Sequence, residues 1–180
     1  MADPTSPRGI RGREFSDGET LGAARRWLRE QARGDGASCP CCSQFVKVYR
    51  RSLNAGIAVA LIRAWRQCGR APWHLPTLFG ASGDIAKARY WQLIEPASDE
   101  LREDGSPRNG WWQLTDAGAQ WVQGVTGVWR YAFVFNGNLL QFDRRDPAGP
   151  TWRVQQALGR KFNFAQLMSD PAPADGAVFT

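Results

Sequence analysis

The stretch from Gly83 to Gly118 constrains the fold more than any other part of this chain. It begins with GDIAKARYWQLIE, continues through a polar segment rich in Asp, Glu and Gly, and ends with GWWQLTDAG. The first part predicts a short helix with small and basic residues on one side and an apolar Leu-Ile pair at its end. A hairpin is expected next, and the threonine near the end opens a further helix. The stretch therefore predicts the order helix, hairpin, helix.

Length and composition favour one domain, or one domain with an appendage. The chain has 180 residues, of which 43 % are hydrophobic, and it contains nine tryptophans, so a packed interior is expected. No apolar run approaches the roughly 20 residues needed to span a bilayer, and the N-terminus lacks a signal-peptide-like hydrophobic segment. We therefore expect a cytoplasmic protein of a bacterial cell with no membrane partner.

Positive charge is concentrated in the middle of the chain. The net charge is +6, and residues 37–95 hold eight Lys and Arg against only Asp84 and Glu95. Clustered positive charge attracts phosphate whatever the base sequence. The distribution predicts a nucleic-acid partner, and a solvated basic face without a ligand is the alternative interpretation.

The N-terminal part is expected to hold a disordered tail, one helix and a cysteine-containing turn. Residues 1–15 show no periodicity. Ser16 and Glu19 match a capping box for a helix that stops near Gly34. Cys39-Pro40-Cys41-Cys42 predicts a tight turn, and the short helix expected after it carries Phe45, Val48 and Tyr49 on one face.

The middle of the chain predicts an alternation of short helices and extended segments. In chain order these are a helix from about 53 to 67 capped by Ser52 or Asn54, a strand at Trp73–Leu75, a turn at 76–82, a helix at Asp84–Leu93, a polar loop at 97–110, a strand at Trp111–Leu114 and a helix at Thr115–Val122. In the helix at Asp84–Leu93, Ile85, Ala88 and Trp91 are expected to face inward and Lys87, Arg89 and Tyr90 outward.

The C-terminal part predicts a hairpin followed by two short helices. Asn136-Gly137 is a dipeptide favoured in two-residue turns, and strands are expected at Arg130–Phe135 and Asn138–Phe142. Short helices are expected near Val154–Leu158 and Ala165–Met168, and the tail 171–180 is expected to be loose.

Residues 53–122 resemble the winged-helix fold of many bacterial and phage DNA-binding proteins. The first supporting match is Ala88-Arg-Tyr-Trp-Gln-Leu93-Ile94, which is similar to the end of that family's recognition helix, and the second is Leu114-Thr-Asp-Ala-Gly118, which is similar to the segment after the wing. Position 92 is Gln where the family usually has Gly, so this turn must tolerate a side chain at positive φ or take another shape.

The resemblance implies the fold class and the division of the chain. We expect an α+β protein with a winged helix-turn-helix core. The expected parts are a disordered tail at 1–15, a winged-helix domain with an N-terminal helix and the CPCC turn at 16–126, a β-hairpin and helix appendage at 127–170, and a loose tail at 171–180.

The resemblance also implies a function, which is non-enzymatic binding of double-stranded DNA. The whole chain resembles phage or prophage proteins that join a CPxC-type turn to such a module, so a phage or mobile-element accessory or regulatory role is expected. Lys87 and Arg89 would reach into the major groove beside Tyr90, while Arg50 and Arg51, together with Lys47, would grip phosphate. The loop 97–110 is acidic at Asp99, Glu100, Glu103 and Asp104, which disfavours a wing that touches phosphates.

A protein-docking role is the alternative, because winged-helix modules also serve as interaction units and the fold does not fix the function. The partner would then be a host or viral protein. No phosphate-binding loop or catalytic arrangement is evident in the sequence, so we do not expect an enzyme.

The cysteines leave three interpretations open. Cys39 and Cys42 have the C-x₂-C spacing of a zinc knuckle, and Cys68 or His74 would have to complete a Zn²⁺ site. An incomplete knuckle is the second interpretation, and plain buried thiols are the third.

Overall fold

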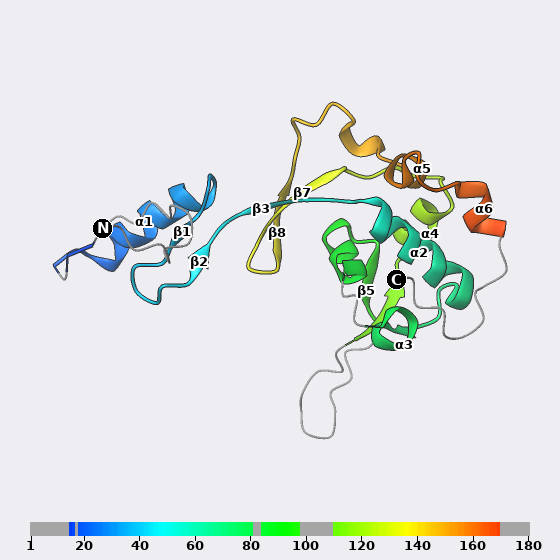
Figure 1. Cartoon of the computed structure of the whole chain (residues 1–180), viewed down its shortest axis with the longest axis horizontal. Helices are drawn as coiled ribbons and strands as arrows, with labels where there is room; N and C mark the ends of the chain where they lie inside the picture. Colours follow the sequence, from blue (N-terminus) through cyan, green and yellow to red (C-terminus); the bar gives the residue numbers. More distant parts are fainter. Residues whose placement is uncertain (1–14, 17, 81–83, 98–109, 170–180) are drawn as a thin grey trace, which may run out of the picture. The chain divides into compact units, whose positions relative to one another are not determined.

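The computed structural model describes residues 15–16, 18–80, 84–97 and 110–169 (Figure 1). They form a mixed α+β structure with small antiparallel sheets, as the sequence predicted. The chain divides into two compact units. Unit 1 comprises Met1–Arg50 with Phe133–Leu140, and unit 2 comprises Arg51–Ala132 with Gln141–Thr180. The tails expected at 1–15 and 171–180 lie outside the described residues apart from Phe15, and the domain boundaries inferred from the sequence stay predictions.

Unit 1 contains helix α1 (Leu21–Ala32) and the strand pair β1 (Ala37–Ser38) and β2 (Phe45–Val46). The capping box predicted at Ser16 and Glu19 is wrong. Thr20 caps the helix instead, because it directly precedes Leu21 in an extended conformation and its Oγ1 accepts a hydrogen bond from the amide of Ala23 at 3.3 Å.

The short helix expected around Phe45 and Tyr49 is also wrong, because these residues lie in strands. Phe45 belongs to β2, which pairs antiparallel with β1, and Tyr49 begins β3 (Tyr49–Ser52). Aromatic and β-branched residues fit a pleated strand well, and pairing with β1 outweighs the weak helical spacing.

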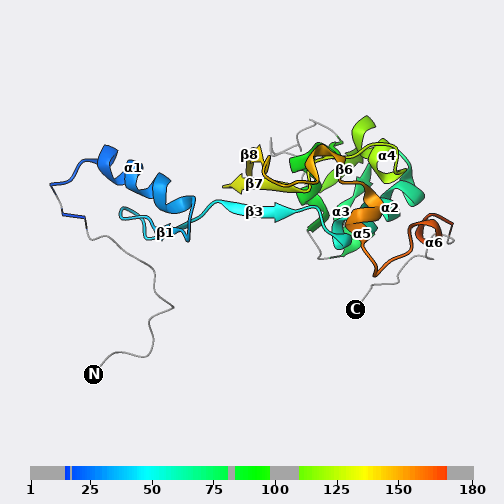
Figure 2. The same cartoon turned by 90° about the horizontal axis from the view of Figure 1, so that it is seen from above.

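Unit 2 is built around helix α2 (Ala55–Cys68), which is capped by Asn54, one of the two expected caps. Ile57, Leu61 and Ile62 on this helix are buried. The helices α5 (Val154–Leu158) and α6 (Phe164–Ser169) pack against α2 (Figures 1 and 2). The C-terminal helices therefore share a core with the middle of the chain.

The middle of the chain supplies the remaining elements of the unit 2 core. They are β4 (Trp73–His74), α3 (Leu75–Phe79), the 3₁₀ helix η1 (Asp84–Trp91), β5 (Ile94–Pro96), β6 (Trp111–Leu114) and α4 (Asp116–Val122). Strand β6 lies between β4 and β5, and both neighbours run antiparallel to it. The predicted strand at Trp111–Leu114 and the helix after Thr115 are confirmed.

The helix predicted at Asp84–Leu93 differs from expectation in kind and in length. Its last helical residue is Trp91, and its geometry is that of a 3₁₀ helix, in which residues three apart lie above one another. Ile85, Ala88 and Trp91 follow this spacing and are all buried, as predicted.

Hydrogen bonds and one close backbone contact join the end of η1 to the start of α4. Thr115 donates from its hydroxyl to the carbonyl of Gln92 and accepts from the amide of Gly118 at 2.9 Å, and its own amide donates to the carbonyl of Leu93. Gln92 has a φ of 57°, so the turn takes the left-handed conformation in spite of its side chain. Gly118 packs directly on the Leu93 carbonyl. A Cβ at this position would lie only 1.9 Å from that oxygen, so the contact requires glycine.

A hairpin of β7 (Tyr131–Phe135) and β8 (Asn138–Phe142) forms as predicted, with Asn136 and Gly137 both at positive φ in the turn. The order in this sheet is β3-β7-β8. A short 3₁₀ helix, η2 (Gly149–Thr151), follows the hairpin.

Tryptophan indoles hold the segment after α4 in place. The Nε1 of Trp121 donates to the carbonyl of Trp152 at 2.9 Å, and the Nε1 of Trp152 donates to the carbonyl of Leu53 at 3.2 Å. The Nε1 of Trp91 donates to the carbonyl of Trp129. A tryptophan can thus bury a large apolar surface while its single donor remains satisfied.

Among the residues that the structure describes, none of the helices combines the length and the apolar character that crossing a bilayer requires.

We predict that Gly118→Ala destabilises unit 2 by about 3 kcal/mol, because the added methyl group would overlap a backbone carbonyl that cannot move without breaking the bonds to Thr115. Urea unfolding followed by tryptophan fluorescence measures this change.

Gly56→Ala in α2 is the matched control, since the nearest atom to its Cβ position is 3.4 Å away. This variant should unfold at the parent midpoint or up to about 1 kcal/mol higher. Equal midpoints for Gly118→Ala and the parent would show that the Leu93–Gly118 contact does not constrain the fold.

Candidate nucleic-acid interface

The 3₁₀ helix η1 presents one side to the core and another to solvent. Its buried residues face α2, against which η1 packs, and the indole of Trp91 is bonded to the backbone at Trp129. The side chains of Lys87, Arg89 and Tyr90 lie between these buried positions and are half-buried or exposed. Because the inner side is fixed, the outer side is held in a defined position.

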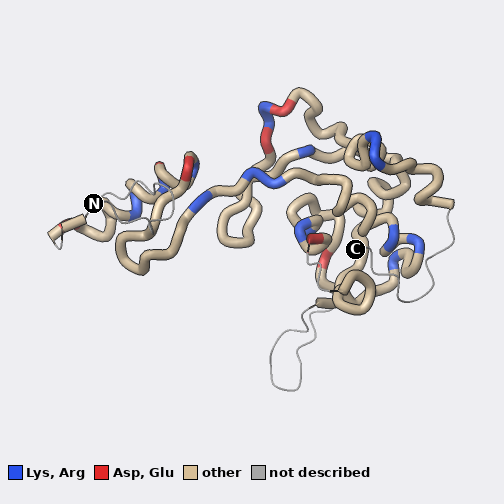
Figure 3. Tube along the Cα trace, viewed as in Figure 1, with Lys and Arg blue, Asp and Glu red and all other residues tan. Residues whose placement is uncertain are grey.

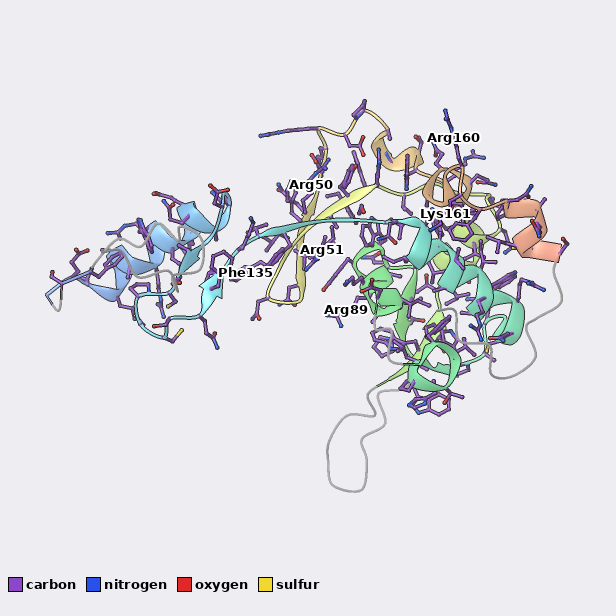
Figure 4. All side chains as sticks on the ribbon, in the orientation of Figure 1. Arg50, Arg51, Arg89, Phe135, Arg160 and Lys161 are labelled. Carbon is purple, nitrogen blue, oxygen red and sulfur yellow. The ribbon has the colours of Figure 1, made fainter. Side chains whose placement is uncertain are left out.

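Arg89 is the exposed cation of this helix. Its guanidinium carbon lies 5.2 Å from the centre of the Tyr90 ring, within the range of a cation–π contact. Figure 4 shows the Arg89 side chain at η1. Arginine is a residue type well suited to phosphate and to base edges, because its planar guanidinium can donate two parallel hydrogen bonds.

Lys87 is paired with a carboxylate one turn away. Its Nζ lies 2.5 Å from Oδ1 of Asp84, and the two side chains are 36 % and 65 % exposed. Exposed ion pairs of this kind contribute about 0–1 kcal/mol, so a polyanion can compete for the lysine. Asp84 nevertheless lowers the local positive potential and would itself face an approaching phosphate.

The residues expected to grip phosphate are divided between the two units. Arg51 is half-buried and belongs to unit 2, whereas Lys47 and Arg50 belong to unit 1, where Lys47 is half-buried and Arg50 is exposed. The expected set is therefore brought together only in part: η1 carries three of its members within eight residues.

Three arginines on α2 or just after it make contacts within the protein. Arg66 donates to the carbonyl of Leu167 at 3.0 Å, Arg70 pairs with Asp116, and the Arg63 guanidinium lies over the ring of Phe79. Figure 3 shows Lys and Arg spread over several elements of unit 2. The positive charge of residues 37–95 is therefore distributed over several elements, and only part of it lies on η1.

Two exposed apolar side chains of unit 2 lie outside η1. Trp111 of β6 is 42 % exposed, and Val125, which follows α4, is 64 % exposed.

Residues 98–109 of the expected acidic wing, including all four of its carboxylates, lie outside the described residues.

Cys39 occupies a tight turn in unit 1, and its sulfur is polarised by the backbone. The pKa of the Cys39 thiol is lowered from its usual 9.0, mainly because the amide of Cys41 donates to it, then because the amide and the side chain of Cys42 do so. By contrast, burial raises the pKa of Cys68, the last residue of α2.

His74 has partners within its own neighbourhood. Its Nδ1 lies 2.9 Å from Oγ1 of Thr77, and its ring lies 5.2 Å from that of Trp111. Cys68 and His74 belong to unit 2 and Cys39 and Cys42 to unit 1. Among the described residues there is no group of three or more His, Cys, Asp or Glu side chains placed to hold a metal ion.

Comparison with known proteins adds no family to this description: no family model, curated protein or solved structure matches the chain.

The sequence analysis missed the role of Asp84 in the candidate interface. The signal was available, since Asp84 and Lys87 are three residues apart and such pairs meet on a helix surface. It also gave no weight to Arg160 and Lys161, two exposed cations that follow α5 (Figure 4).

We predict that Cys39 is alkylated faster than Cys68 at neutral pH. The thiolate is the reactive form of cysteine. The lowered pKa of Cys39 gives it a larger thiolate fraction at neutral pH than an ordinary cysteine. The raised pKa of Cys68 keeps that thiol protonated at neutral pH. Iodoacetamide labelling at several pH values, followed by peptide mass spectrometry, measures both rates.

The same labelling in urea is the control, because unfolding removes both shifts and should make the two rates converge. Equal rates in the folded protein across the whole pH range would contradict the hydrogen-bonded state of the Cys39 sulfur.

Proposed function

We propose that residues 53–122 form a winged-helix module that binds double-stranded DNA through the outer side of η1. The observation that carries this proposal is the placement of Lys87 and Arg89 on a helix whose opposite side is buried against α2. Phosphate contacts from such side chains position a protein on the duplex, and contacts with base edges add sequence preference.

The order of elements supports the proposal. The expected order is helix, short strand, compact turn, second helix, two-strand wing and trailing helix. The chain has α2, β4, α3, η1, the strands β5 and β6, and α4 in that order, with the short helix α3 where the compact turn is expected. The antiparallel order β4-β6-β5 suits a wing that joins the last two strands. The contacts among Gln92, Leu93, Thr115 and Gly118 give a physical reason for both sequence motifs.

The charge of unit 2 agrees with this proposal. Arg51 lies in the same unit as η1 and adds a cation to it. Eight residues of 3₁₀ helix extend about 16 Å, enough to follow a major groove over a few base pairs. The role that suits such a module is that of an accessory or regulatory factor of a phage or mobile element.

A protein-docking function is the second candidate, and the exposed Trp111 and Val125 favour it. Aromatic side chains are enriched at protein interfaces, and the acidic composition of the loop 97–110 suits a basic protein partner better than a phosphate backbone.

We predict that Lys87→Ala combined with Arg89→Ala weakens binding to a mixed-sequence duplex by at least about thirtyfold, since each lost contact costs about 1–3 kcal/mol. The dependence of log K on log salt should also become shallower by about two units, one for each phosphate contact removed. Fluorescence anisotropy with a labelled duplex at several salt concentrations measures both effects.

Two further variants sharpen this test. Arg160→Ala with Lys161→Ala removes the same charge away from η1 and should leave most of the affinity. Asp84→Asn should strengthen binding, because it releases Lys87 and removes a carboxylate, whereas Asp116→Asn, which releases Arg70, should not. Salt-insensitive or absent binding, or an equal loss in both double variants, would reject DNA as the partner of η1.

A further inference from the structure

The CPCC turn in unit 1 has a closed and well-defined backbone. Strands β1 and β2 pair with Ser38 opposite Phe45. Immediately inside this pair, the amide of Cys39 donates to the carbonyl of Gln44, and the amide of Ser43 donates to the carbonyl of Cys39, both at 2.8 Å. Residues 40–43 are therefore confined to the tip of a hairpin.

The turn is completed by a residue in the left-handed conformation. Ser43, directly after Cys42, has a φ of 59°, a value that a non-glycine residue adopts only where the surrounding structure requires it. This reversal lets the chain return to β2 straight after the second cysteine of the C-x₂-C pair. Cys39 and Cys42 therefore lie at the two ends of one tight turn.

The amides of Cys41 and Cys42 and the side chain of Cys42 lie within hydrogen-bonding reach of the Cys39 sulfur. Amide donors directed at a cysteine sulfur are the arrangement that supports and orients a thiolate bound to a metal ion. Two thiolates presented by one tight turn form half of a tetrahedral Zn²⁺ site.

The other half is not supplied by the described residues near the turn. No third His, Cys, Asp or Glu side chain among the described residues joins the pair in a metal-binding group. Cys41 and Cys42 are exposed, so the tip is accessible to another molecule. The neighbouring Phe45 is 49 % exposed, which adds apolar surface that a close partner would cover.

We propose that Cys39 and Cys42 are zinc ligands and that a second copy of this chain completes the site with its own Cys39 and Cys42. Two identical half-sites related by a twofold axis give four thiolates, the ligand set of a closed structural zinc site. The shared ion joins two copies at their hairpin tips. This inference does not depend on DNA binding by unit 2.

The test uses the full chain, purified under reducing conditions and titrated with Zn²⁺ alone. Native mass spectrometry should find one ion for every two chains, and sedimentation should show a doubling of mass that a chelator reverses. Co²⁺ in place of Zn²⁺ should give the intense thiolate-to-metal absorption and the visible bands of a tetrahedral four-sulfur site.

Variants separate this site from other arrangements. Cys39→Ser and Cys42→Ser should each abolish the ion-dependent dimer, while Cys41→Ser and Cys68→Ser should retain it. The cobalt spectrum of the unaltered chain gives an independent result should a variant fail to fold.

Three outcomes would overturn the proposal. The first is absence of zinc binding by the parent, and the second is unchanged binding in both Cys39→Ser and Cys42→Ser. The third is one ion per single chain that is lost in Cys68→Ser or His74→Gln, which would mean that the chain closes the site by itself.

Discussion

The contact between the Leu93 carbonyl and Gly118 is the constraint on which the arrangement of the middle of the chain depends. Because a Cβ at position 118 would overlap the carbonyl, only glycine lets α4 approach the end of η1 this closely. Thr115 then joins the two sides, bonding to the Gln92 carbonyl with its hydroxyl and to the Leu93 carbonyl with its amide. The residues that end η1 and the residues that begin α4 are therefore fixed against one another. We call these contacts the η1–α4 joint.

The η1–α4 joint fixes the position of η1, the helix that carries the candidate interface. Strand β5 leaves the joint on one side and β6 enters it on the other, so the sheet that follows η1 is fixed by the same few bonds. The indole of Trp91 fixes the buried side of η1 by donating a hydrogen bond to the Trp129 carbonyl. Because η1 is fixed at its end and along its inner side, the backbone positions of Lys87 and Arg89 are fixed as well. Such preorganisation reduces the entropy lost when a ligand binds.

Local sequence signals predicted several elements where turn chemistry was explicit, but the capping box at Ser16 and Glu19 failed because Thr20 directly precedes α1. Asn136-Gly137 predicted the hairpin, Asn54 and Thr115 predicted helix starts, and the spacing of Ile85, Ala88 and Trp91 predicted the buried side of η1. The prediction failed at residues 45–49, where Phe45 pairs with β1 and Tyr49 begins a strand next to β7, because the partner strands cannot be read from the local pattern.

The candidate site was less predictable than the fold, because net charge does not show which cations are committed to internal contacts. Arg66 and Arg70 belong to the charge excess but contact α6 and α4. Their partners, the Leu167 carbonyl and Asp116, are far away in the sequence, so only the folded chain brings them together. The division of Lys47 and Arg50 from Arg51 between two units was likewise invisible in the sequence.

Backbone amide NMR shifts of the labelled protein, titrated with a short DNA duplex, would locate the binding surface residue by residue. If η1 is the DNA-contacting element, the shifts will be largest over Asp84–Trp91, and the indole signal of Trp111 will hardly move. Unchanged η1 amides at a DNA concentration that saturates binding, or shifts confined to Trp111 and Val125, would contradict this interpretation.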